Sequence, residues 1–494
     1  MPRSPNASAK FESPEDKVID KVIDKVGRMR RIQLISANRC TNPDPVFPLG
    51  LAHLSAALRR AGYEVAWLDV LAGAEGLGDM LKSWRPDFVG ISLRNIDDVL
   101  IRKRETFFGE LGSLVETVRQ ETRCPVILGG SGFSIFPQQL LELAGADYGI
   151  CGEGEAGLVA LVEALENDGE LERVPGLVYR RDGTIRVNAA SFCAFDGELS
   201  EADRPGPITG HYLRNSGVLN VQTQRGCGFR CDYCTYPLIE GRRHRRRPPE
   251  LVAAEFEQIQ RLGARYVFVV DSVFNSSARH VTEVCEAMLR RNVKMSWGCF
   301  LRPKGLTPEL MQLMARAGLK HIEFGTDSFC DEVLAAYQKD FSFDDILQAS
   351  EAARQAKVDF CHFLIAGGPG ETAETLRTGW RNSQRLNGGA ILAVVGMRIY
   401  PGTALFEQAV AEGQICRDAD LLAPTYYLAP GLTTESVFGQ IQEFARVSPN
   451  WIVGDPSRVY QNMVERLRQR GVLGPLWSYF VMMQRIRPDI GVSA

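Results

Sequence analysis

The stretch that most constrains this chain is TQRGCGFRCDYCTYP, residues 223–237, which begins at the end of a short apolar segment. It places Cys227, Cys231 and Cys234 at CxxxCxxC spacing, so that three thiolates within eight residues can hold one metal centre. A structural zinc site needs a fourth protein ligand nearby, whereas the next cysteine, Cys285, lies far downstream in a segment expected to be helical. A four-iron cluster with one iron left open for a small molecule fits these ligands better.

Two other interpretations of these cysteines are a structural zinc knuckle and buried apolar thiols, because free cysteine is often part of a core. The residues around them, Gly226, Gly228, Arg230 and Asp232, are typical of a polar, flexible loop rather than of a core segment. Free thiols in such a loop would be exposed to oxidation. A ligand role therefore accounts best for the cysteines.

Length and composition limit the class of protein. A chain of 494 residues is too long for a single core and predicts two large domains with additions. Its 45% hydrophobic and 24% charged residues are typical of a soluble globular protein, and its net charge of -3 gives no sign of a nucleic-acid or membrane surface. The longest apolar runs, such as 266–270 and 477–483, are too short to span a bilayer, and the N-terminus has no apolar signal core. Twelve cysteines spread along the chain do not resemble a secreted disulfide scaffold, so we expect a cytoplasmic protein.

Residues 30–165 alternate between strand-like and helix-like segments, after a polar tail at 1–29. Five short apolar strands separated by helices predict a doubly wound, Rossmann-like α/β domain with a parallel sheet. A ligand of such a sheet binds beyond the carboxyl ends of the strands. The expected strands are 31–36, 63–70, 87–93, 125–130 and 147–154, and the loops at their carboxyl ends are 39–48, 94–98, 129–134 and 152–155.

The order of segments in this region, with PLGLAHLSAALRRAGYEV, SLRNIDD, ILGGSGFS and GICGEGE, is similar to a known family. It resembles the cobalamin-binding domain that precedes the catalytic domain of many radical S-adenosylmethionine (SAM) enzymes, from Arg31 to about Leu165. The cobalamin contacts that this resemblance implies are Asn95, Gly129, Gly130, Ser131, Gly152 and Glu153.

One departure from that family concerns the axial ligand of cobalt. Many cobalamin-binding domains carry a DxHxxG motif after the first strand, whose histidine ligates cobalt, but the loop here reads SANRCTNPDPVFPLG and has no histidine. His53, the nearest histidine, is expected on the surface of the following helix. We therefore expect cobalamin to be held without a histidine ligand.

A second alternating pattern occupies residues 217–405, after a hairpin at 174–187 and a linker that together make up 166–216. Its strands and intervening helices predict a partial (βα)6 barrel with its chemistry at the carboxyl ends of the strands. Residues 406–494 are expected to form a small helical C-terminal region that caps the open barrel. The expected strands are 218–224, 265–271, 294–300, 320–327, 358–367 and 392–400.

The CxxxCxxC spacing, with Tyr233 before the third cysteine, and several motifs at the ends of these strands resemble the radical SAM superfamily. The motifs are DS after the second strand, GTDS after the fourth, GGPGET after the fifth and RIYPGT after the sixth. The resemblance implies that Cys227, Cys231 and Cys234 hold a 4Fe-4S cluster whose open iron binds SAM. The SAM contacts that it implies are Tyr233, Asp271, Ser272, Asp327, Ser328, Gly367, Gly368 and Arg398.

The activity that this resemblance implies is generation of a 5'-deoxyadenosyl radical from SAM, followed by cobalamin-dependent C-methylation of an unactivated carbon in lipid or natural-product biosynthesis. The expected partners are a small-molecule or lipid substrate and an electron donor such as flavodoxin or ferredoxin, with no nucleic acid and no membrane span. Two alternatives remain: radical cyclisation, rearrangement or oxidation without methyl transfer, and an iron-sulfur redox sensor. The strand-end motifs speak against the sensor.

Alternation along the strands adds candidates for substrate contact. Asn220, Gln222 and Gln224 share one face of the first strand of the second pattern, and His321, Glu323 and Asp327 share one face of the fourth. His362 and Arg398 lie on the next two strands, where each is as compatible with a structural role. The run RRHRRR, residues 242–247, is typical of a solvated loop in a chain of this net charge; the alternatives are contact with a phosphate or nucleic acid and a position near the mouth of the cluster site.

Overall fold

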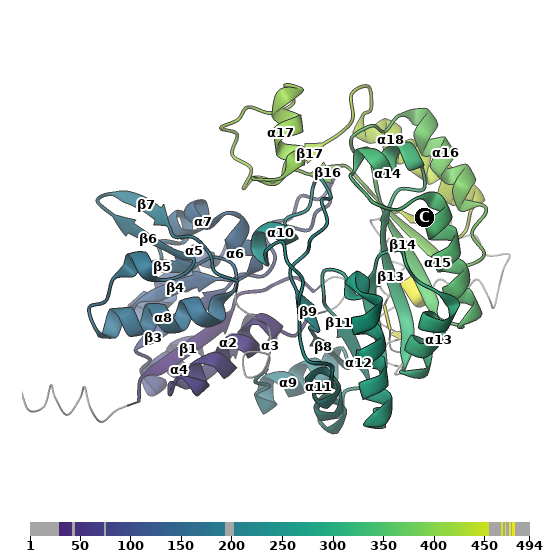
Figure 1. Cartoon of the computed structure of the whole chain (residues 1–494). Coiled ribbons are helices and arrows are strands. Elements are labelled where there is room, and N and C mark those ends of the chain that lie inside the picture. Colours follow the sequence, from purple (N-terminus) through teal and green to yellow (C-terminus); the bar gives the residue numbers. More distant parts are fainter. Residues whose placement is uncertain are drawn as a thin grey trace, which may run out of the picture.

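The computed structural model describes residues 29–41, 45–73, 76–192, 202–453, 466–467, 470, 474–475 and 477–479. Two seven-stranded sheets, one early and one late in the chain, organise these residues (Figure 1). The expected polar tail lies outside the described residues except for Met29.

The first sheet confirms the predicted doubly wound α/β fold. Five parallel strands run in the order β2-β1-β3-β4-β5, and helices cover both faces. Side chains of β1 alternate between the two faces, so Leu34 packs with α2 and α8 whereas Ile35 packs with α4, α5 and α7. The elements are β1 (Arg31–Ser36), α2 (Leu49–Arg60), β2 (Glu64–Asp69), α4 (Leu77–Trp84), β3 (Phe88–Ser92), α5 (Leu111–Glu121), β4 (Val126–Gly129), α7 (Pro137–Ala144), β5 (Tyr148–Ile150) and α8 (Gly154–Glu166).

The predicted hairpin forms from β6 (Leu177–Arg181) and β7 (Thr184–Val187). It pairs antiparallel with β5, so that it extends the first sheet rather than lying outside it. The expected linker also contains a helix, α9 (Gly206–Asn215). We therefore propose that the first structural unit reaches Val187.

The second sheet contains all six predicted strands, parallel and in the spatial order β15-β14-β13-β12-β11-β8. The first of these ends earlier than expected because Gln224–Arg225 form a separate strand, β9, that pairs antiparallel with β10 (Arg245–Arg246). The strands are β8 (Val218–Val221), β11 (Tyr266–Val269), β12 (Ser296–Leu301), β13 (Leu319–Asp327), β14 (Asp359–Ala366) and β15 (Ala390–Val395).

The predicted helical C-terminal region is present, but it also contains strands. Helices α17 (Ala404–Ala411) and α18 (Thr434–Val447) are present, but β18 (Trp451–Val453) adds a seventh parallel strand beside β15. A further strand, β17 (Tyr426–Tyr427), pairs antiparallel with β16 (Met397–Arg398). Strands of two or three residues are too short to show a period of two in the sequence.

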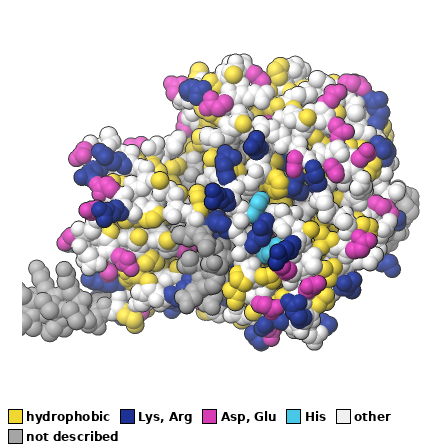
Figure 2. All heavy atoms as spheres, in the orientation of Figure 1, with side chains coloured by type: hydrophobic (Ala, Val, Ile, Leu, Met, Phe, Trp, Pro, Cys, Tyr) yellow, Lys and Arg dark blue, Asp and Glu magenta, His cyan; other side chains and the backbone are white. Residues whose placement is uncertain are grey.

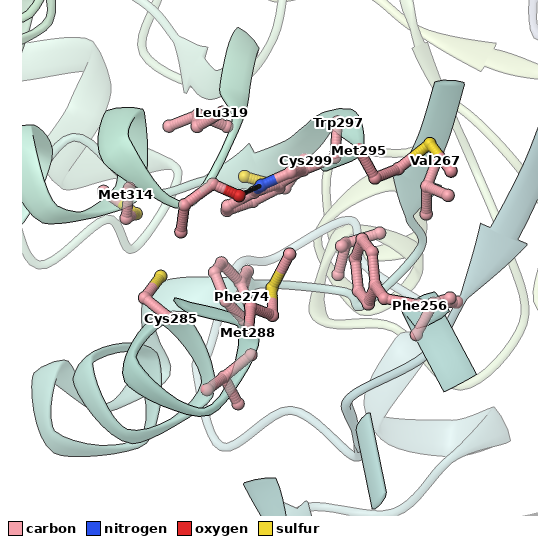
Figure 3. Packing of buried hydrophobic residues seen from close by; sticks show 14 of the residues in the cluster. Phe256, Val267, Phe274, Cys285, Met288, Met295, Trp297, Cys299, Met314 and Leu319 are labelled. Atoms are coloured by element: carbon pink, nitrogen blue, oxygen red, sulfur yellow. Dashed lines mark hydrogen bonds between the residues drawn. The ribbon is translucent and has the colours of Figure 1, made fainter. Parts of the chain in front are cut away.

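One face of the second sheet is covered by helices, and the alternation of β12 explains why. Trp297 and Cys299 face the helices α11 (Pro249–Arg261), α12 (Ala278–Arg290) and α13 (Pro308–Arg316), and pack there with Phe274 and Cys285 (Figure 3). The indole N–H of Trp297 donates to the Ala317 carbonyl at 2.9 Å. Cys285 and Cys299 are therefore core thiols, and Cys285 lies in a helix as expected. The residues that alternate with Trp297 and Cys299 in β12, Gly298 and Phe300, face the opposite, concave side of the sheet.

The two units lie side by side, the first in purple to blue and the second in teal to yellow (Figure 1). Buried ion pairs join them: the Arg398 Nε lies 2.9 Å from an Asp97 carboxylate oxygen, and an Arg225 guanidinium nitrogen lies 2.7 Å from Glu155. None of the described helices is long and apolar enough to cross a membrane.

Candidate active site

The cysteine loop runs from β9 to α10 (Tyr236–Ile239), at the carboxyl end of β8. Gly226 begins it with a positive φ of 82°, and a Cβ at this position would lie 2.1 Å from the Arg243 carbonyl oxygen. The Cys227 N–H donates to the Gly241 carbonyl at 3.0 Å, and the Cys234 N–H donates to that of Cys231 at 3.3 Å. Only glycine at position 226 allows residues 241–243 to lie this close to the loop.

The three predicted ligands lie close enough to affect one another. Burial raises the pKa of Cys227 and Cys231, and burial together with the two other thiols raises that of Cys234 to about 12. Among the described residues no three His, Cys, Asp or Glu side chains converge on a single ion. A cluster instead distributes its thiolates over separate iron atoms. It also supplies the positive charge that buried thiolates need, since metal binding deprotonates cysteine.

Three side chains meet beside the loop, of which Tyr233 is half-buried and Asp327 is buried. The hydroxyl group of Tyr233 donates to the Asp327 carboxylate at 2.6 Å, and Lys339 forms an ion pair with the same carboxylate. Lys339 also lowers the pKa of Cys231, although burial as the larger effect raises it. The predicted residues Tyr233 and Asp327 therefore do come together. Lys339 was missed because AYQKD has no motif that distinguishes it.

The turn GGPGET is tied to the loop by a residue that the sequence also did not single out. The Tyr337 hydroxyl group accepts from the Gly368 N–H at 3.1 Å and donates to the Ile365 carbonyl at 2.9 Å. The Tyr337 carbonyl in turn accepts from the Asp232 N–H at 3.4 Å, within the cysteine loop. The other predicted glycine, Gly367, donates its N–H to the Glu371 carboxylate.

The remaining predicted SAM residues of the strand ends make local contacts. Asp271 is fully buried and accepts from the Thr223 N–H and hydroxyl group at 2.6 and 2.5 Å, so it holds the start of the cysteine loop. Burial raises the pKa of Asp271 to about 7. The Ser272 hydroxyl group donates to the Gly226 carbonyl at 3.3 Å, whereas that of Ser328 accepts from the Cys330 N–H at 3.2 Å.

A cavity of about 430 Å³ lies between the two units, and we call it the junction cavity. Its wall on the first unit is formed by the loops at the carboxyl ends of the strands, as predicted for a doubly wound sheet. The opposite wall comes from β8 and from α10, the helix that directly follows the cysteine loop. All six predicted cobalamin residues line it: Asn95, Gly129, Gly130, Ser131, Gly152 and Glu153.

The junction cavity fits a large ligand with amide edges. Gly130 has a φ of 99°, and a Cβ there would lie 2.5 Å from the Leu93 carbonyl oxygen, so the backbone itself forms the wall. The Oδ1 atom of Asn95 and the Nδ2 atom of Asn38 are buried and have no hydrogen-bond partner within the described part of the chain, and both residues line the cavity. One acceptor and one donor thus remain for a ligand. No histidine is among the described lining residues.

Two expectations about charged residues near this cavity are wrong. His53 is buried, not on the surface, and burial followed by the charge of Arg225 lowers its pKa to about 3. The run 242–247 is only partly solvated: Arg245 pairs with Glu153, and Arg247 is buried. The partner of Arg245 lies on the other unit, whereas Arg247 pairs with Glu255 on the helix that follows it.

Several candidates for substrate contact have structural partners instead. Arg398, also predicted to contact SAM, pairs with Asp97 and donates to the Leu421 carbonyl at 2.7 Å. His362 faces away from the concave side, between the hydroxyl groups of Thr326 and Ser350 at 2.7 and 3.1 Å. Asn220 and Gln222 line the junction cavity, whereas the Gln224 side chain donates to the Phe274 carbonyl at 3.1 Å.

Two family models match the chain. Residues 221–378 match the radical SAM superfamily, and residues 40–162 match the B12 binding domain. The first match contains the cysteine loop, and the second contains most of the first-unit wall of the junction cavity, including all six predicted cobalamin residues but not Asn38.

Two curated relatives and one solved structure are similar to this chain over more of its length than either family model. A tryptophan 2-C-methyltransferase of Streptomyces laurentii is 26% identical over 443 residues, which cover 76% of this chain and 73% of that protein. A hopanoid C-3 methylase of Methylococcus capsulatus is 27% identical over 352 residues, covering 66% of this chain and 64% of that protein. The fold matches TsrM from Kitasatospora setae, a radical S-adenosylmethionine methyltransferase solved with cobalamin and a [4Fe-4S] cluster bound. Its TM-score is 0.81 at 22% identity, over 93% of this chain and 98% of that one.

The environment of His362 leads to a test by pH. Burial lowers its pKa from 6.5 to about 3, so the folded protein keeps the ring neutral while the unfolded chain protonates it below about 6.5. The unfolded state then binds more protons, and the free energy of unfolding falls as the pH drops through this window, by up to about 1.4 kcal/mol per unit. We expect His362→Gln to lose this part of the slope in urea unfolding, whereas His211→Gln on α9 keeps it. An unchanged slope in His362→Gln would contradict the assignment.

Proposed function

Since this chain is a radical SAM protein with a B12-binding domain, we propose that it transfers a methyl group to an unactivated carbon of a small molecule or lipid. Its cofactors are a 4Fe-4S cluster, SAM and cobalamin. When bound, the cluster and SAM supply the radical chemistry that removes a hydrogen atom from the substrate, and cobalamin supplies a methyl group. The chain itself binds and orients these groups and excludes water.

One observation supports this proposal most directly. The loops that we assign to cobalamin and the residues that follow the cysteine loop line the same cavity. Thr235 directly follows Cys234, and Thr235, Tyr236, Ile239 and Glu240 line the junction cavity. Methyl transfer to a carbon that has lost a hydrogen needs both reactive groups at one place. A cavity that begins where the loop ends meets this requirement.

We assign the cluster to Cys227, Cys231 and Cys234, and SAM to the surrounding strand ends. Asp327 and Gly368 are held there by Lys339 and Tyr337. The other proposed SAM contacts are Tyr233, Asp271, Ser272, Ser328 and Gly367. Arg398 we now assign to the junction between the units, because its guanidinium already has partners.

Cobalamin is held, in this proposal, by the loops at Gly129–Ser131 and Gly152–Glu153 and by Asn95. Support comes from the unpartnered polar atoms of Asn38 and Asn95 and from the backbone wall at Gly130. Glu153 acts indirectly, because its carboxylate pairs with Arg245. The oxygen-sensitive cluster leads us to propose a reducing, cytoplasmic setting.

We also propose that a small acidic protein, such as flavodoxin or ferredoxin, delivers the electron to the cluster. Arg230 lies within the cysteine loop, and Arg242 and Arg243 lie directly on it; all three are exposed and form no ion pair within the described residues. Figure 2 shows Lys and Arg side chains, with histidine, near the middle of one face. In a chain of net charge -3, such a group favours an acidic partner over a nucleic acid that would need a wider basic surface.

The first test replaces the cluster ligands. We expect Cys227→Ala/Cys231→Ala/Cys234→Ala to lose cluster iron, SAM cleavage and transfer of a deuterated methyl group from SAM, but to keep cobalamin, because the first unit has its own core. The control is Cys124→Ala/Cys416→Ala, which removes thiols outside the loop. Brown charge-transfer absorption that persists in the triple variant would refute the assignment. Turnover without methyl transfer would favour cyclisation, rearrangement or oxidation instead.

The second test concerns the axial face of cobalt. With no histidine in the loop 39–48 or among the described lining residues of the junction cavity, we expect no nitrogen ligand from the protein. Cobalamin's own dimethylbenzimidazole nitrogen can also split the cobalt lines of the cob(II)alamin form into triplets in electron paramagnetic resonance. The splitting should therefore be the same in unlabelled and in 15N-labelled protein, because labelling changes only the protein's nitrogen atoms. Triplets that become doublets in the labelled protein would show that this expectation is wrong.

The third test uses charge reversal in Arg242→Glu/Arg243→Glu. Reduction of the cluster by reduced flavodoxin should slow by about tenfold or more at low salt, because the steering charge is inverted. Reduction by dithionite should not change. The control Arg265→Glu/Arg316→Glu changes the same charge at the amino ends of β11 and β13. Equal slowing in both variants would mean that only net charge matters and that the surface is not a docking site.

A further inference from the structure

The concave face of the second sheet carries a mainly apolar set of side chains. Phe300 of β12 lies opposite Glu323 of β13, and Gly325 lies opposite Phe363 of β14. Phe363 lies opposite Leu392 of β15 in turn. Side chains on this face are those that the covering helices do not bury.

The space in front of Gly325 is open. Gly325 is exposed although it lies within a central strand, and a Cβ built on it meets no atom within 4 Å. Beside it, Phe300 is 37% exposed and packs edge-on against Phe268, with ring centroids 5.0 Å apart. Phe363 is partly buried, because it packs against a cluster that contains Trp477 and Ile452. Aromatic side chains left exposed in a concave surface mark a place for a ligand.

One carboxyl group lies at the floor of this space. Glu323 accepts from the indole N–H of Trp477 at 3.0 Å through Oε1, and its other oxygen has no partner within the described part of the chain. Below it, His321 is already paired with the Tyr266 hydroxyl group at 2.9 Å. Burial raises the pKa of Glu323 to about 7.

The space also adjoins the proposed SAM site. Asp327, which contacts Tyr233 of the cysteine loop, lies two residues after Gly325 on the same strand. The side chain of Asp327 is fixed by its pairing with Lys339. A molecule in front of Gly325 would therefore lie beside the carboxyl end of β13, where the chemistry of such a sheet takes place.

We propose that this space, bounded by Phe300, Glu323, Gly325 and Phe363, is the substrate chamber, and that it takes an apolar molecule anchored by one O–H or N–H group to Glu323. The proposal rests on the proposed function and names its substrate class. A phosphorylated or otherwise anionic substrate is disfavoured, because a carboxyl group forms the floor and Phe300 and Phe363 offer no positive charge. Trp477, from the C-terminal region, positions the Glu323 carboxyl group that anchors the substrate.

The probes for this proposal are 1-naphthol, which has one O–H group, naphthalene, which has none, and 1-naphthyl phosphate. Binding to the holoenzyme is measured by equilibrium dialysis, and bound probe is quantified after extraction. We expect 1-naphthol to bind about tenfold more tightly than naphthalene, as one hydrogen bond to a buried acidic group allows. 1-Naphthyl phosphate should bind least.

Two variants test the apolar space in front of Gly325 and the carboxyl group of Glu323 separately. Gly325→Leu fills the open space without backbone strain, since Gly325 has no positive φ, and should abolish binding of both 1-naphthol and naphthalene. Glu323→Ala should remove only the preference for 1-naphthol, whereas Glu323→Gln keeps an acceptor and should retain part of it. The control is Gly439→Leu on α18, another glycine with open space in front of it.

Unchanged binding in Gly325→Leu, an unchanged preference in Glu323→Ala, or tighter binding of 1-naphthyl phosphate than of 1-naphthol would each overturn the proposal. Cluster iron, cobalamin content and SAM cleavage with dithionite are measured in the same variants. These report on the proposed function separately, because neither Gly325 nor Glu323 is assigned to a cofactor. Normal cofactor chemistry with unchanged probe binding would therefore reject the chamber alone.

Discussion

The structure depends on buried charges that join its two units. Arg398 reaches Asp97, and Arg225 reaches Glu155, each across the boundary between the sheets. A buried charge without its partner is costly, so these pairs fix one relative position of the units rather than adding much stability. The junction cavity exists because that position holds the loops of the first sheet against β8 and α10.

The same balance of burial and charge governs the cysteine loop. Burial opposes ionisation of its thiols, and the cation of Lys339 beside Cys231 only partly offsets this effect. A bound iron cluster would supply the missing positive charge. The loop is nevertheless shaped before any metal arrives, because Asp271 holds its start and Gly226 lets residues 241–243 lie against it.

The concave face shows how one sheet can serve two purposes. The residues of β12 that face the helices, such as Trp297, form an ordinary core (Figure 3). Phe300, their neighbour in sequence, faces the other way and stays partly exposed. The period of two thus separates the core side of this strand from the side that we propose for substrate, and Glu323 of the neighbouring strand gives that side a buried acidic group.

Sequence alone determined the main strands of both sheets, the cysteine loop and the glycine-rich loops that line the junction cavity, because periodicity, glycine-rich turns and cysteine spacing are local signals. The motifs at the strand ends also predicted that Tyr233 and Asp327 belong to one site, and the two side chains are hydrogen-bonded. Only the tertiary structure decided that His53 is buried, that Arg398 pairs with Asp97 and that Lys339 belongs to the site. Each of these features depends on neighbours that tertiary contacts supply: Asp97 for Arg398, Asp327 and the Cys231 thiol for Lys339, and burial beside Arg225 for His53. Neither propensity nor spacing records which residues a fold brings together.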